Sequence, residues 1–198
     1  MKKLIFIFIS ILFMLMIQSC RTYSFYRDIP PQMSAVDFSK GKWILGNISV
    51  DLDYRDEITK LAFEDFSKHL QNRLINVNND RTLLLPAVVP FYLDKSKILD
   101  LKKGTNCDYF INIKCENERN NGNQFDTYEK TYYKKQLTLA KVSIEIYDLN
   151  LGTIVFYQGI SSFYDENIGL SYNPARTLIF GCYGKLIDDI NKKSIFHR

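Results

Sequence analysis

The spacing of hydrophobic residues changes several times along the chain, and each spacing predicts a different element. Over 43–52, Ile48, Val50 and Leu52 occupy every second position, which is typical of a strand with one buried face. The spacing then lengthens to three or four residues and predicts an amphipathic helix. Its apolar stripe consists of Ile58, Leu61, Ala62, Phe66, Leu70 and Leu74. Asp53 precedes the stripe and is the predicted N-cap of this helix.

The middle of the chain predicts a short strand, a second helix and a longer strand. The short strand is expected over 82–85. The helix is expected over 95–103, with Asp94 as its N-cap and Gly104 just beyond its last turn. Apolar side chains then alternate over 108–116 and predict the longer strand.

The last third of the chain predicts a polar loop followed by a β-hairpin. Polar residues fill 117–128, which we expect to be the loop. In the strand over 137–147 the apolar positions change from odd to even numbers around Ala140, which predicts a β-bulge there. A turn at 148–152 leads into a return strand over 153–164.

The C-terminal segment predicts a helix with Pro174 at its first position. Its apolar face consists of Ile179, Cys182, Tyr183, Leu186, Ile187 and Ile190. The order β-α-β-α-β-β-β-α predicts one α/β (α+β) domain over 41–194, with a mixed sheet and helices packed on it. Its last three strands are expected to form an antiparallel meander. Residues 20–40 lack a sustained period and are expected to be a tether, and 195–198 a short tail.

The N-terminus carries the pattern of a secretory leader. Lys2 and Lys3 precede an apolar run over 4–17, which has the length of a signal-peptide core and is shorter than the ~20 residues of a membrane span. The following Ile17-Gln18-Ser19-Cys20 resembles the lipobox of bacterial lipoproteins, although Gln18 stands where a small residue is usual. We therefore expect 1–19 to be a signal peptide, with a short uncleaved membrane anchor as the alternative.

The lipobox resemblance implies a covalent lipid rather than a cofactor. A thioether-linked diacylglycerol and an amide-linked acyl chain would both be carried by Cys20 as the first mature residue. Several acyl chains give a durable membrane anchor, whereas one gives marginal binding. Arg21 stands where an aspartate would indicate inner-membrane retention. An anchor in the outer membrane, facing the periplasm, is therefore expected.

Composition and charge limit the partners. The 198 residues include 26 Lys and Arg against 22 Asp and Glu, and without the two leader lysines the balance is 24 against 22, or +2. Because nucleic-acid binding needs concentrated positive charge, no nucleic-acid partner is expected. An apolar fraction of 46% is sufficient for the packed core of a single domain.

Two stretches resemble a group of bacterial envelope proteins. They are 107–113, which reads Cys-Asp-Tyr-Phe-Ile-Asn-Ile, and the hairpin over 142–156. Both resemble the small α/β domain of penicillin-binding-protein activator lipoproteins, the curli secretion channel and the N-terminal domain of the Tol-Pal β-propeller protein. That group shares no catalytic residues, so the resemblance implies none here. Its channel members insert hairpins into the membrane, but 116–135 is too rich in Asn, Glu, Lys and Arg to face lipid, so no pore is expected.

Residues that could carry metal or acid–base chemistry are few. Neither His69 nor His197 has a second ligand at metal-binding spacing, and we expect His69 to be a partly buried surface residue. The densest acidic cluster consists of Asp51, Asp53, Asp56 and Glu57. Helix capping explains that cluster better than a calcium site, because its spacing matches no calcium loop. No catalytic residue, metal or cofactor is expected.

The cysteines leave two interpretations open. Besides Cys20 the chain has Cys107, Cys115 and Cys182, of which the last two fall on predicted inward faces. A Cys115–Cys182 disulfide is compatible with the periplasm. Free thiols that act as small core residues are the alternative.

One cluster, Tyr132-Tyr133-Lys134-Lys135, is the candidate partner surface, because aromatic and basic residues are common at interfaces. An ordinary outward strand face is the alternative. We expect a non-enzymatic interaction module that binds an envelope protein or a cell-wall component. The alternatives are an enzyme that acts on glycans or peptidoglycan through two carboxylates, and a subunit of a homo-oligomeric export assembly.

Overall fold

The strands form one mixed, six-stranded sheet. The computed structural model describes residues 23–28, 35–50, 52–77, 83–126, 131–165 and 174–193. The strands are β1 (Phe25–Arg27), β2 (Trp43–Leu45), β3 (Leu74–Asn76), β4 (Tyr109–Asp126), β5 (Thr131–Asp148) and β6 (Thr153–Asp165). Their spatial order is β1-β6-β5-β4-β2-β3, with β2 parallel to both β3 and β4 and the other pairs antiparallel.

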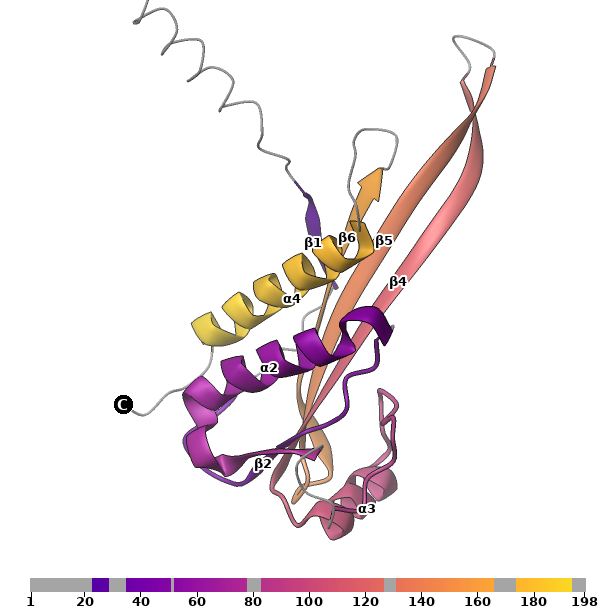
Figure 1. Ribbon diagram of the computed structural model, residues 1–198. Coiled ribbons are helices and arrows are strands. Elements are labelled where there is room, and N and C mark those ends of the chain that lie inside the picture. The colour runs from indigo at the N-terminus through magenta and orange to yellow at the C-terminus, as the bar shows by residue number, and fades with distance from the viewer. Residues whose placement is uncertain are drawn as a thin grey trace, which may run out of the picture.

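Three helices cover the sheet from two sides. The helices are α2 (Arg55–Leu70), α3 (Lys95–Thr105) and α4 (Pro174–Lys193), with short 3-10 turns at Leu52–Tyr54 and Gln71–Arg73. Helices α2 and α4 lie side by side on one face, and α3 lies on the other face at the end away from the β4–β5 tip (Figure 1). The single-domain α+β fold with a terminal β4–β5–β6 meander is therefore confirmed.

The main core lies between the sheet and the two long helices. The predicted apolar face of α4 is buried along its whole length, and Ile58, Ala62, Phe66 and Leu70 are the buried residues of α2. Leu74 does not belong to that helix, because the chain turns after Leu70 and Leu74 begins β3. The predicted strand over 82–85 is wrong, because residues 83–85 form no strand. The strand that follows α2 and pairs parallel with β2 is β3 instead.

Two predicted helix boundaries need correction. Helix α2 begins after Tyr54, which makes no side-chain capping bond, so Asp53 is not its N-cap. Asp94 caps α3 as predicted and accepts from Lys97 N–H at 3.0 Å. Gly104 lies inside α3, and Asn106 ends the helix with φ +51°. The glycine is explained by contact instead, since a Cβ there would lie 2.4 Å from the carbonyl oxygen of Leu84.

Strand β5 continues without a bulge through Ala140, contrary to the prediction. Its register against both neighbours is continuous from Leu137 to Ile146, and the irregularity with β6 falls between Ile146 and Tyr147. Side chains alternate strictly along a regular strand. Leu139 therefore faces away from the helices, opposite to Val142, and the change from odd to even positions marks two apolar faces rather than one.

The predicted polar loop over 117–128 is a strand as far as Asp126. Every residue of β4 from Tyr109 to Asp126 pairs with a residue of β5. Backbone hydrogen bonds hold such a ladder, and they leave no hydropathy signal where both faces of the strand meet water. The absence of an apolar period therefore did not indicate a loop.

The segment predicted as a tether contributes to the domain. Within 20–40, β1 pairs antiparallel with the edge of β6, and Val36 and Phe38 are buried in the main core. The ring of Phe38 packs on Trp43 with a centroid distance of 5.1 Å. Packing that ties this segment down is non-local, so the residues alone show no period.

Candidate functional site: the outer sheet face and the hairpin arm

The face of the sheet opposite to α2 and α4, here called the outer face, is covered only in part. Helix α3 and the segment over 83–94 pack on one end of it, around Phe110 and Tyr147. Among the described residues, no helix or loop packs on the outer face towards the tip of β4 and β5 (Figure 1). The two ends of this face differ in chemistry.

A buried carboxylate fastens the 83–94 segment to the outer face. Glu145 is fully buried and accepts hydrogen bonds from the Tyr92 backbone N–H, at 3.2 and 3.1 Å, and from the Tyr147 hydroxyl. Burial raises the pKa of Glu145, and the two hydrogen bonds oppose that rise. The Asn112 amide donates to the carbonyls of Val89 and Pro90 at 3.0 and 3.3 Å. These contacts hold an irregular segment in one place.

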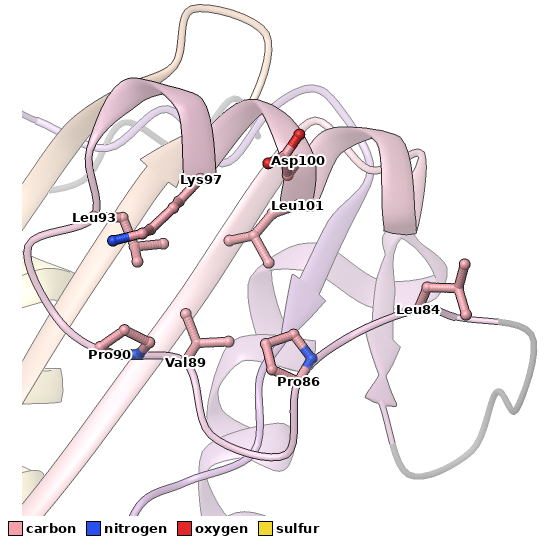
Figure 2. Close-up of a pocket in the computed structure, with 8 residues that line it drawn as sticks. All are labelled: Leu84, Pro86, Val89, Pro90, Leu93, Lys97, Asp100 and Leu101. Atoms are coloured by element: carbon pink, nitrogen blue, oxygen red, sulfur yellow. The ribbon is translucent and has the colours of Figure 1, made fainter.

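A cavity of about 240 Å³ lies between this segment and α3 (Figure 2). Its lining is mainly apolar and consists of Leu84, Pro86, Val89, Pro90, Leu93, Lys97, Asp100 and Leu101. The two charged residues are already paired, Lys97 with Asp94 at 3.2 Å and Asp100 with Lys103 at 3.0 Å. Asp100 is the one carboxylate in the lining, so this cavity does not bring together the two acids of a glycosidase.

A second polar cluster connects the edge strand β1 to the outer face. The Asp28 carboxylate accepts from the Tyr157 hydroxyl at 2.9 Å and pairs with Lys141 at 2.9 Å. Burial, followed by hydrogen bonds to Tyr92 and Asp28, raises the pKa of Tyr157, so its hydroxyl stays a donor at neutral pH. A Cβ on Gly159 would lie 2.2 Å from the Asp28 carboxylate, which explains the glycine in β6.

Three large apolar side chains lie beyond this cluster and form what we call the outer patch: Tyr26, Leu139 and Phe163. Leu139 and Phe163 are directly opposed across β5 and β6, and the rings of Phe163 and Tyr26 stack with centroids 5.8 Å apart. All three are exposed. Glu118 is opposed to Leu139 across β4 and borders the patch.

Past the outer patch the sheet narrows to two strands, here called the arm. Strand β6 ends where Asp165 pairs with Leu137, but β4 and β5 continue through six further pairs to Asp126 and Thr131. Six residues of strand extend about 20 Å. The arm therefore projects well beyond the helices (Figure 1).

Asp108 is a junction that the residue pattern did not single out. Its carboxylate accepts from the Lys42 backbone N–H at 2.9 Å, from Lys102 at 3.0 Å and from the Asn150 amide at 3.1 Å. These bonds lower the pKa of Asp108 to about 2, the backbone bond most. Asp108 thereby joins β2, α3 and the β5–β6 turn. The signals in the sequence were an aspartate directly before a strand and its place in the stretch 107–113 that resembles the envelope proteins.

The predicted partner surface falls on the arm. Tyr132, Tyr133, Lys134 and Lys135 belong to β5 and pair with 122–125 of β4. Their side chains lie outside the described residues, as does Cys20. Strands β4 and β5 form one long hairpin here, where the sequence predicted a loop followed by a separate strand.

The three described cysteines are free and buried, so the Cys115–Cys182 disulfide is not formed. Burial raises the pKa of Cys115 and of Cys182 to about 12, which keeps both thiols protonated. Cys107 is equally inaccessible, and its pKa is also raised by burial. The alternative of small core residues is therefore the one that the structure favours.

The remaining candidates have structural contacts. His69 bonds to the side chain of Asn191 at 2.9 Å and stacks on Phe38. Glu57 of the acidic cluster pairs with Arg176 of α4, while Asp51 lies outside the described residues. Among the described residues no group of three metal-binding side chains comes together. No helix in the described ranges is long and apolar enough to cross a membrane.

Comparison with known proteins gives distant likenesses. No family model and no curated protein matches the chain. A PelC dodecamer from Paraburkholderia phytofirmans is similar with a TM-score of 0.45 and 11% identity, over 88% of this chain and 100% of that chain. Lipoprotein GNA1162 from Neisseria meningitidis has a TM-score of 0.42 and 10% identity, over 77% and 99%. A neuraminyllactose-binding hemagglutinin homolog from Helicobacter pylori has 0.42 and 14%, over 82% and 83%. Since each of these TM-scores is below 0.5, these likenesses carry no conclusion about the function of this chain.

Proposed function

We propose that this protein is a lipid-anchored, non-enzymatic interaction module of the bacterial cell envelope, held by Cys20 and binding its partner through the arm. The expected partner is an envelope protein or a cell-wall component. The expected location is the periplasmic side of the outer membrane.

The observation that supports this proposal is the length of the arm. A two-stranded ribbon is marginally stable in water without a third strand or a helix over it. The arm has neither past the pair Leu137–Asp165 within the described residues. A partner that adds a strand or a surface to it would supply the missing contacts. Within the described residues the main core includes no residue of the arm, and we take binding as the simplest reason for the arm's length.

The enzyme alternative receives less support. General acid–base cleavage of a glycan needs two carboxylates that face one cavity. Two acids of the outer face are engaged elsewhere. The fully buried Glu145 holds the Tyr92 backbone, and the partly buried Asp28 holds Tyr157 and Lys141. Each is therefore explained by the packing of one segment on the sheet.

Photocrosslinking in cells tests the arm. A photoreactive residue at Tyr132 or Tyr133 should give discrete crosslinked species that mass spectrometry identifies. The matched control is the same residue at Leu151, which is 63% exposed in the turn at the other end of β5. Equal crosslinking at the arm and at Leu151, or none at the arm, would contradict the proposal.

The anchor is tested separately. Cys20→Ala should leave a full-length precursor and abolish labelling by a fatty-acid analogue. A variant that is labelled and processed like the wild type would show that Cys20 is not the lipid-bearing residue.

A further inference from the structure

The outer patch is a small apolar surface to which β1, β5 and β6 each contribute one side chain. Leu139 lies on the outer face only because β5 runs past Ala140 without a bulge. Phe163 lies directly opposite it, and Tyr26 stacks on Phe163, so three strands bring large apolar groups to one place. Leu139 is 38% exposed, Phe163 41% and Tyr26 53%. Contiguous apolar groups mark binding surfaces more often than scattered apolar residues do.

The chain brings the outer patch close to Cys20. Tyr26 is six residues after Cys20, and an extended chain of that length spans at most about 21 Å. Strand β1 runs from the pair Phe25–Ser162 to the pair Arg27–Ile160, antiparallel to β6. The chain therefore enters β1 from the end of the sheet that carries the arm, and Tyr23 still contacts Tyr164 there, with centroids 6.2 Å apart.

The direction of the arm restricts how the anchored domain can be oriented. With the sheet upright on the membrane and its anchored end down, the arm would point into the bilayer. The segment 116–135, which contains most of the arm, is too polar for hydrocarbon. With the outer face turned towards the bilayer, the arm runs along the surface and the outer patch meets the interface. Tyrosine suits that position, because it has an apolar ring and a polar tip.

The size of the outer patch agrees with a contact to the bilayer interface. Taking about 200 Å² for each of the two aromatic residues and somewhat less for Leu139, the exposed parts of the three residues come to roughly 250 Å². A stable protein interface buries about 800 Å² on each partner. The patch is too small for that, but a protein that acyl chains already hold at the membrane needs only an orienting contact.

We propose that the end of the outer face not covered by α3 and the 83–94 segment contacts the bilayer through Tyr26, Leu139 and Phe163, so that the arm extends along the membrane surface. This inference depends on the proposed lipid anchor at Cys20. It makes the bilayer interface the ligand of the outer patch and restricts partners of the arm to those present at that surface.

Bromolipid quenching tests the contact in the complete lipidated protein. Phe163→Trp places an indole in the outer patch, and Lys60→Trp places one on α2 at the opposite side of the sheet, where the Lys60 side chain is 80% exposed. Both proteins share the buried Trp43 as background. Each is reconstituted into vesicles of phosphatidylethanolamine and phosphatidylglycerol, with and without bromine on the acyl chains. Tyr26→Trp replaces Phe163→Trp if the latter has a lowered melting temperature.

The expected result is blue-shifted emission from F163W that is lost in brominated vesicles, with no such loss from K60W. Vesicle flotation distinguishes failure of the lipid anchor from failure of the contact between the outer patch and the bilayer. Protein that does not float overturns the anchor and this inference with it. Protein that floats but shows equal responses from the two variants overturns this inference alone. A blue shift without quenching would mean that protein covers the patch, either a second copy or another partner, and would also overturn it.

Discussion

The helix-covered face and the outer face of the sheet use the same strands but differ in what their side chains contact. On the helix-covered face, Ile144 and Ile146 are fully buried in one continuous apolar core. On the outer face, the neighbouring Glu145 is also fully buried, but it holds an irregular segment by hydrogen bonds. Farther along β5, Leu139 is exposed. One face therefore carries a continuous apolar core, whereas the other has a smaller core at one end and exposed apolar residues towards the arm.

The largest expected effect comes from a charge on the helix-covered face. Leu186 is fully buried in α4, so Leu186→Asp would leave an unpaired carboxylate in the core. We expect a loss of at least about 3 kcal/mol in the free energy of unfolding. Urea titration followed by circular dichroism measures it. A loss below about 1 kcal/mol, as expected of a substitution on the surface, would mean that α4 is not part of the core.

A smaller effect is expected at the Asp108 junction. Asp108→Asn keeps an acceptor for Lys42 but removes the ion pair with Lys102. Because the carboxylate is one-third exposed and screened by solvent, we expect a loss of about 1–2 kcal/mol at pH 7.

The pH dependence sharpens that prediction. The folded pKa of Asp108 is about 2, below the unfolded value near 3.9. Its contribution is therefore complete above pH 4 and is lost as the pH falls towards 2. D108N should lose less stability than the wild type over that range. Parallel stability curves of the two proteins below pH 4 would contradict this assignment.

The contribution of Glu145 to the free energy of unfolding should have the opposite pH dependence. Its folded pKa is raised by burial, so the folded state binds more protons than the unfolded state in the window above pH 4.3 or so. Through this group, stability falls as the pH rises through that window. Glu145→Gln keeps a carbonyl acceptor for Tyr92 without the charge. The stability of E145Q relative to the wild type should therefore increase from pH 4 to pH 8, as thermal unfolding at fixed ionic strength would measure. A constant difference would mean that the carboxyl titrates normally.

The smallest stability effect is expected on the arm. Tyr132 and Tyr133 lie on β5 beyond the last pair with β6. Changing both to serine should alter the free energy of unfolding by no more than about 0.5 kcal/mol. The same variant should lose its crosslinked partners in cells. A large fall in the melting temperature, with partners retained by the folded fraction, would make these tyrosines core residues.

The spacing of apolar residues predicted the elements that form the helix-covered core. It did not predict the strands that rest on backbone pairing between distant parts of the chain. The face of α4 from Ile179 to Ile190 was predictable, because one apolar side repeats at helical spacing. Strand β1 and the arm were not, since edge pairing and a solvated ribbon rest on backbone hydrogen bonds.

The candidate site was predictable only in outline. The residues at 132–135 were predicted as a candidate surface, and the structure places them on the long β4–β5 hairpin. Glu145 and Asp28 gave no signal, because their partners Tyr92 and Tyr157 are far away in sequence. The odd-to-even change at Ala140 predicted a bulge, and that prediction was wrong. In the structure β5 is regular at Ala140, and Leu139 therefore lies in the outer patch.

The most direct test of the account removes the arm and leaves the rest of the domain. Replacing 121–136 by Asn-Gly would join the paired residues Asn120 and Leu137 through a two-residue hairpin turn. We predict a melting temperature close to that of the wild type, normal lipid labelling, and loss of the arm-dependent partner in cells. A protein that unfolds, or one that keeps the partner, would contradict the assignment of stability to the helix-covered face and of binding to the arm.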